Sequence, residues 1–158
     1  LKDYASSFEE GKADVLGLYM VESLADRGEL DKAKLADNYV TFLAGILRSV
    51  RFGATDAHAR ANMVRFNYFA DRGAFRRDPA TGTYRVDFAK MEDAVEALSR
   101  ELLTIQGDGD YAAAQRLAAQ LGVVRPELAA DLARLDAAGI PIDVRFEQGL
   151  DVLGLAAP

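Results

Sequence analysis

The chain has 158 residues, of which 50% are hydrophobic and 28% are charged, and its formal net charge is −6. This length is sufficient for one domain with its own hydrophobic core. The acidic balance, without a basic stripe, argues against a nucleic-acid partner. No uncharged run approaches the roughly 20 residues that span a bilayer, so we expect no membrane segment. There is no cysteine, which excludes a disulfide framework and thiol chemistry.

Apolar residues recur at three- and four-residue spacing along most of the chain, which is typical of amphipathic helices. Gly28, Gly53 and Gly73 are each expected to end a helix. Asp56 or Thr55 can cap the helix that follows Gly53. The sequence therefore predicts about six helices, over residues 8–26, 32–51, 57–71, 88–106, 111–121 and 126–138.

Residues 74–86 contain two short alternating runs on either side of a turn with Pro79 and Gly82, which predicts a β-hairpin. Residues 140–146 alternate and are β-branched, which is typical of an extended tail or an edge strand. We therefore expect a mainly α fold, in which a multi-helix array carries one small hairpin. Residues 1–158 form a single domain in this prediction, with residues 140–158 as its tail.

Three carboxylates stand where the first predicted helix begins. Glu10 and Asp14 are four residues apart, so they share one helical face, and Glu9 lies beside them. The uncharged run 15–21 that follows predicts a helix that is buried on nearly every side. Acids at the entrance of a buried helix must be solvated, paired or bound to a cation.

A structural interpretation of these acids is available. Ser7-x-x-Glu10 and Ser6-x-x-Glu9 both match a capping box, in which the side chains satisfy the free N–H groups of a helix start. Acids in a first turn also complement the helix dipole.

The hexapeptide Glu9-Glu10-Gly11-Lys12-Ala13-Asp14, followed by Gly17-Leu18-Tyr19, resembles the Glu-Glu-x-Arg/Lys-Ala-Glu/Asp motif of the dipeptidyl peptidase III family of zinc metallopeptidases. The resemblance implies that Glu10 is a zinc ligand and that Glu9 and Asp14 hydrogen-bond the zinc-bound histidines. A carboxylate ligand suits a catalytic zinc that keeps one position open for water. Zinc-bound histidines usually donate their second N–H to a carboxylate.

The chain has a single histidine, His58, and lacks the His-Glu-x-x-x-His helix that carries the other two zinc ligands in that family. The chain also begins at Leu1 without a methionine or a signal-peptide pattern. We therefore expect the C-terminal part of a longer zinc peptidase, whose upstream segment supplies the histidines. The motif is most similar to the bacterial zinc-dependent hydrolases of the family, some of which carry an N-terminal nudix-type domain.

His58 lies in an Ala-His segment followed by a hydrophobic run that ends at Gly73. A lone helical histidine is most often structural or on the surface. The resemblance implies instead that His58 contacts the peptide substrate near the scissile carbonyl and helps to stabilise the transition state. Arg48 and Arg51 either complement a helix dipole or bind substrate, and the sequence assigns neither a role.

Two hypotheses of different classes follow. In the first, the chain supplies a zinc ligand to a peptidase, and the isolated fragment does not hydrolyse peptides. In the second, the chain is a non-catalytic, acidic helical module that binds a partner. A His-Glu-x-x-x-His segment encoded shortly before Leu1 favours the first. Because cysteine is absent, we expect a cytoplasmic protein, with an upstream targeting segment left open.

Overall fold

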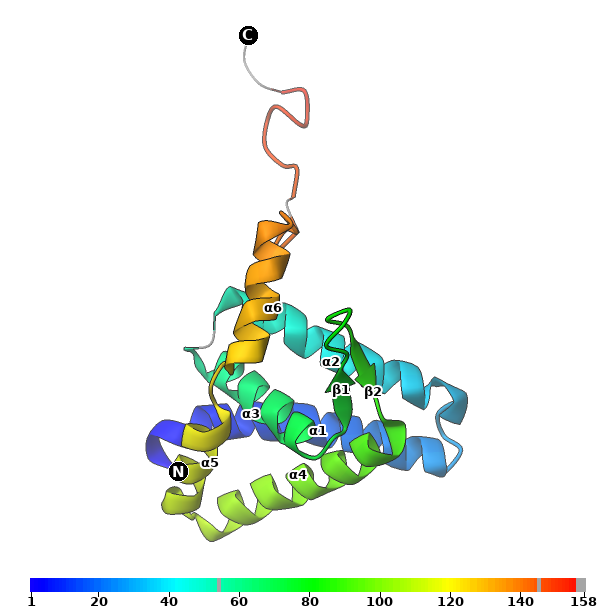
Figure 1. Cartoon of the computed structure of the whole chain (residues 1–158), viewed down its shortest axis with the longest axis vertical. Helices are drawn as coiled ribbons and strands as arrows, with labels where there is room; N and C mark the ends of the chain where they lie inside the picture. The colour runs from blue at the N-terminus through cyan, green and yellow to red at the C-terminus, as the bar shows by residue number, and fades with distance from the viewer. Residues whose placement is uncertain (54, 145, 156–158) are drawn as a thin grey trace.

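A computed structural model describes residues 1–53, 55–144 and 146–155. Within these residues the structure is a helical array with one two-stranded antiparallel hairpin, so the predicted mainly α fold is confirmed (Figure 1). The elements are α1 (Ala5–Asp26), α2 (Leu35–Ser49), α3 (Ala57–Asp71), β1 (Phe75–Arg77), β2 (Tyr84–Val86), α4 (Phe88–Asp108), α5 (Tyr111–Leu121) and α6 (Pro126–Ala137).

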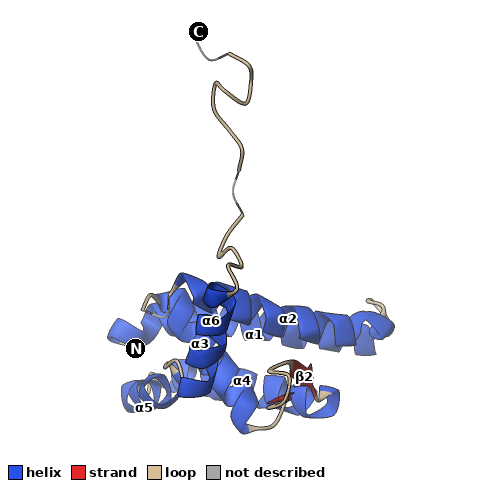
Figure 2. Ribbon diagram, turned by 45° about the horizontal axis from the view of Figure 1, so that its top comes forward, coloured by secondary structure: helices blue, strands red, loops and turns tan. Residues whose placement is uncertain are grey.

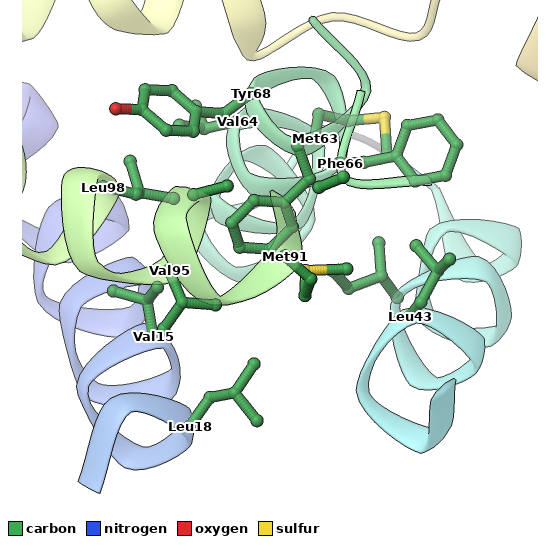
Figure 3. Close-up of a cluster of buried hydrophobic side chains, with 14 of the residues drawn as sticks. Val15, Leu18, Leu43, Met63, Val64, Phe66, Tyr68, Met91, Val95 and Leu98 are labelled. Atoms are coloured by element: carbon green, nitrogen blue, oxygen red, sulfur yellow. The ribbon is translucent and has the colours of Figure 1, made fainter. Parts of the chain in front are cut away.

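The core lies where α1, α2, α3 and α4 meet, and α1 contacts the other three helices. Figure 3 shows side chains from all four helices pointing into this space. Fully burying an aliphatic or aromatic side chain is worth about 1.5–3 kcal/mol, so this cluster is the main source of stability. Its buried members include Val15, Leu18, Leu43, Met63, Phe69, Met91, Val95 and Leu98.

Helix α3 is buried on almost all sides, because nearly every residue from its first turn to Phe69 is shielded from water. Three of these buried residues are polar, namely Asn62, Arg65 and Asn67. Buried polar groups must be hydrogen-bonded to be tolerated. The side-chain NH2 group of Asn67 donates at 2.8 Å to the backbone carbonyls of both Leu121 and Val123, which fixes the link between α5 and α6.

The hairpin anchors α6 to the array. Arg77 of β1 donates from Nε and from a terminal nitrogen to the two carboxylate oxygens of Asp131, both at 2.6 Å. The Tyr84 hydroxyl donates to the same carboxylate at 2.6 Å. Behind this network, the ring of Phe75 packs on Phe66 of α3 with 4.8 Å between centroids. One face of the hairpin thus packs on α3 through aromatic rings while charged groups hold α6.

The start of α1 differs from the prediction. The helix begins at Ala5, after a 3₁₀ turn over Lys2–Tyr4, and its N-cap residue is Tyr4, whose side chain makes no capping bond. The Ser7 hydroxyl donates back to the Tyr4 carbonyl at 3.1 Å and accepts no N–H bond from the first turn. The capping-box interpretation is therefore wrong, and Glu9 and Glu10 lie in the second turn, free for other contacts.

The prediction that α1 is buried on nearly every side is also wrong. Val15 and Leu18 face the core, but Tyr19 and Met20 are 36% and 51% exposed. One face of the helix packs on α2, α3 and α4, whereas the side chains of Glu9, Glu10 and Asp14 are 62%, 37% and 47% exposed. None of the helices in the described parts of the chain combines the length and apolar character needed to cross a bilayer.

Residues 140–144 and 146–155 include no strand, so of the two alternatives for this region the edge strand is wrong. The segment leaves the far end of α6 and extends away from the helices (Figure 2). Arg51 fixes its base by donating to the carbonyls of Ile140 and Pro141 at 2.6 and 2.9 Å, and Arg48 pairs with Asp143 at 3.0 Å. In this structure the two arginines thus bind the chain that follows α6.

Candidate functional site

The acidic face of α1 lies against one face of α3. Glu10 and Asp14 are one helical turn apart on α1, and His58 and Arg65 are two turns apart on α3. Each acid meets a different basic residue: Glu10 pairs with His58, and Asp14 pairs with Arg65. Residues that are 48 and 51 positions apart in the sequence are thereby brought together at the predicted site.

The pair nearest the surface joins Glu10 and His58. The Nε2 atom of His58 lies 2.9 Å from Oε2 of Glu10, which is hydrogen-bond distance. The side chains of Glu10 and His58 are 37% and 68% exposed. The carboxylate is therefore oriented by the imidazole and remains accessible to a further ligand from outside the chain.

The second pair is deeper. Arg65 is 2% exposed, and its NH1 atom lies 2.8 Å from Oδ2 of Asp14, whose side chain is 47% exposed. Burial lowers the pKa of the Arg65 guanidinium, and the negative charge of Asp14 opposes this shift. An arginine keeps its charge in proteins, so the pair is ionic.

Glu9 makes different contacts. Its carboxylate accepts hydrogen bonds from Lys12 at 2.9 Å and from the Gln106 side chain of α4 at 3.1 Å. Both bonds lower the pKa of Glu9, and the bond from Lys12 has the larger effect. The structure thus brings Glu10, Asp14 and His58 to the α1–α3 boundary, and it places Glu9 between α1 and α4, on a shallow groove that Glu10 also lines.

Glu10 and His58 carry donor atoms that zinc accepts. A zinc site held by protein needs three or four such ligands, and the residues that the structure describes include no group of three His, Cys, Asp or Glu side chains arranged to hold a metal ion. Asp14 and Glu9 are engaged by Arg65 and Lys12. The donor set therefore fits a contribution to a zinc site and does not fit a complete one.

Sequence reasoning missed Arg65. It follows His58 by seven residues, which places both on one face of α3, and it interrupts the otherwise uncharged run 61–70. A charged residue at a core-facing position of a strongly apolar helix is the signal that could have identified it, because such a charge requires a partner.

Gly11 of α1 faces Ala61 of α3 and Leu102 of α4. A methyl group at this position would lie 3.6 Å from Cβ of Ala61 and 3.9 Å from Cδ1 of Leu102, which is ordinary contact. We therefore expect Gly11→Ala to raise the free energy of unfolding by about 0.5–1 kcal/mol, because glycine weakens a helix interior. Urea denaturation checks this, and a lower stability would mean that α1 and α3 cannot accept the methyl group.

Comparison with known proteins connects this site to two solved structures. Dipeptidyl peptidase III from Caldithrix abyssi superposes with a TM-score of 0.86 and 41% identity over 90% of this chain. Dipeptidyl peptidase III from Corallococcus sp. strain EGB gives a TM-score of 0.83 and 39% identity over 90% of this chain. The chain has a dipeptidyl peptidase III-like fold. It spans 27% and 26% of those two chains, so it corresponds to about a quarter of each.

A curated plant protein also matches. Nudix hydrolase 3 of Arabidopsis thaliana is 42% identical over 144 residues, which cover 91% of this chain and 18% of that protein. No family model matches the chain. Proteins with two different enzyme names thus share this dipeptidyl peptidase III-like segment. Since each is several times longer than the shared part, the segment alone does not decide between the named activities.

Proposed function

We propose that this chain is the part of a zinc-dependent, dipeptidyl peptidase III-like peptidase that supplies the glutamate ligand of the metal, Glu10. The observation that carries the proposal is the Glu10 carboxylate itself, which His58 holds at 2.9 Å and which stays open to solvent within the Glu9–Asp14 motif. The two histidine ligands come from a segment of the longer protein outside these 158 residues.

The remaining motif residues orient this site in our proposal. Asp14 gives Oδ2 to Arg65, and its half-exposed carboxylate offers the other oxygen to the N–H of a zinc-bound histidine. Glu9 has the same task for the other histidine, at the boundary with α4. His58 contacts the peptide substrate near the scissile carbonyl. Bound zinc would supply the Lewis acid that polarises this carbonyl and activates water. We place the protein in the cytoplasm.

One observation favours the alternative, a non-catalytic helical interaction module. Every acid of the motif already has a basic partner inside the chain: Lys12 for Glu9, His58 for Glu10 and Arg65 for Asp14. A surface whose charges are balanced internally needs no metal to be stable. The metal content of the protein decides between the two.

The test measures zinc by mass spectrometry after mild zinc loading, in the 158-residue chain and in a longer form of the protein that includes its flanking sequence. We expect one zinc per molecule in the longer form, lost on Glu10→Ala, because the mutant removes one of three protein ligands. The 158-residue chain should hold little zinc with or without Glu10.

Two results would contradict the proposal in different ways. A longer form that binds no zinc would support the interaction module. Stoichiometric, Glu10-dependent zinc in the 158-residue chain would mean that this chain completes a site by itself or with a second copy, using His58. Asp3→Ala, an exposed acid outside the motif, is the control and should leave the zinc content unchanged.

A further inference from the structure

We propose that Arg65 is the positioning residue of this site: from beneath the acid motif it fixes the Asp14 carboxylate and the α1 backbone at Glu10, and so places the Glu10 carboxylate opposite His58. The inference deepens the proposed function and rests on it for the role of Glu10 as a metal ligand. The positional role itself depends only on contacts within this chain.

The contacts of Arg65 span both ends of the motif. Its NH1 atom donates to Oδ2 of Asp14 at 2.8 Å and, at 3.4 Å, to the backbone carbonyl of Glu10. Its NH2 atom donates to the side-chain oxygen of Asn62, one turn back on α3. The guanidinium lies 5.7 Å from the ring centroid of Phe42. One rigid, planar group therefore ties two successive turns of α1 to α3.

The geometry links Arg65 to the exposed pair. Glu10 is held twice by the same face of α3, through its backbone carbonyl by Arg65 and through its side chain by His58. The Asp14 carboxylate is held at one oxygen by a guanidinium that is 2% exposed and also bonded to Asn62, so its orientation is set before any external group arrives. Preorganised ligands and hydrogen-bond acceptors are what a metal site requires of its surroundings.

Stability alone is a weak reason for a buried arginine here. Removing a guanidinium from water costs several kcal/mol, and apolar side chains of similar volume often serve a core as well or better than an ion pair. Arg65 is 2% exposed, and it is the one charged residue among the buried residues of α3. Its directional bonds to the motif are what an apolar side chain could not provide.

The test uses the only histidine of the chain as a reporter of the Glu10–His58 pair. The ring nitrogen resonances of His58 are recorded by NMR at one constant pH in the wild type, in Glu10→Gln and in Arg65→Met. We expect Arg65→Met to move the His58 resonances at least halfway from the wild-type position to that of Glu10→Gln, because the Glu10 backbone and the Asp14 carboxylate lose their anchor.

Arg77→Met is the matched control. It removes another mostly buried arginine, one that pairs with Asp131 of α6. It should lose stability without moving the His58 resonances. His58 resonances at the wild-type position in Arg65→Met would overturn the proposal, whatever the loss of stability. If Arg65→Met does not fold, Arg65→Lys takes its place, because a lysine cannot reach Asp14, Glu10 and Asn62 together. A His58 signal at the wild-type position in Arg65→Lys would equally overturn the proposal.

The measurement needs no zinc. If the longer protein does not bind zinc through Glu10, the proposed function is wrong, but the conclusion that Arg65 positions Glu10 is unaffected. If the His58 signal does not move, the positioning role of Arg65 is wrong, and the zinc proposal still depends on the metal measurement.

Discussion

Replacing Asp131 with asparagine is expected to lower the free energy of unfolding by about 3 kcal/mol at neutral pH, because it leaves a mostly buried guanidinium without its counter-ion. The side chains of Arg77 and Asp131 are 18% and 9% exposed, and the same carboxylate accepts the Tyr84 hydroxyl. The substitution weakens both bonds and detaches α6 from the hairpin. Urea denaturation of the two proteins at pH 7 measures the difference.

Asp71→Asn is the matched control for this prediction. Asp71 also receives two bonds from an arginine, Arg125, but the side chains of this pair are 46% and 37% exposed. An exposed ion pair is worth about 0–1 kcal/mol. Equal losses in Asp71→Asn and Asp131→Asn would show that burial of the α6 network contributes nothing.

The pH dependence gives an independent check on Asp131. The Arg77 guanidinium, helped by the Tyr84 hydroxyl, lowers the pKa of Asp131 to about 2, whereas an unfolded aspartate titrates near 3.9, by order of magnitude. A carboxylate whose pKa is lower in the folded state stabilises the fold above the unfolded pKa, and this stabilisation is lost as the pH falls through the folded value. The stability difference between wild type and Asp131→Asn should therefore be constant above about pH 5 and shrink toward pH 2.

Local signals were sufficient for most helices. Helix α3 begins after Asp56, whose side chain accepts from the Ala59 N–H at 2.8 Å, and α5 begins after Asp110, which caps Ala113 in the same way. Helix α4 runs two residues past the predicted end because Gly109, rather than Gly107, adopts the left-handed conformation that closes it. Side-chain caps and glycines act within a few residues, so the sequence displays them directly.

The start of α1 could not be predicted in this way. The serine–glutamate spacing is compatible with a capping box, yet Ser7 and Phe8 are buried and the helix is extended so that this turn packs on its neighbours. Tertiary packing decided between two locally acceptable starts. The error matters for the site, because it moves Glu9 and Glu10 from capping positions into the body of the helix, where their carboxylates reach α3 and α4.

The sequence singled out residues for the candidate site without indicating how they contact one another. Glu10, Asp14 and His58 were singled out, and the structure brings all three to the α1–α3 boundary. That His58 pairs with Glu10, and that Asp14 pairs with Arg65, depends on how two helices separated by about 50 residues pack against each other. Periodicity gives the face of each helix and leaves the register between two helices open.

In the longer protein that we propose, His58→Ala should lower kcat about 10²–10³-fold against a peptide substrate, with a small change in KM. This is the effect of removing one donor from a developing oxyanion. His58→Gln is the conservative variant, because its amide keeps an N–H donor at a similar reach, and it should recover part of the lost rate. Steady-state kinetics on the three proteins, with zinc measured in each, provides the comparison.

The zinc content distinguishes two possible roles of His58, which are orienting Glu10 and contacting the substrate. The imidazole lies 2.9 Å from Glu10, so it can orient the ligand, contact the substrate, or do both in turn. If His58 acts on the substrate, His58→Ala keeps its zinc and loses kcat. If His58 serves only to orient Glu10, zinc affinity and kcat fall together, and added zinc restores the rate. An enzyme that stays fully active and zinc-loaded after His58→Ala would exclude both roles and leave the histidine as a surface partner of Glu10.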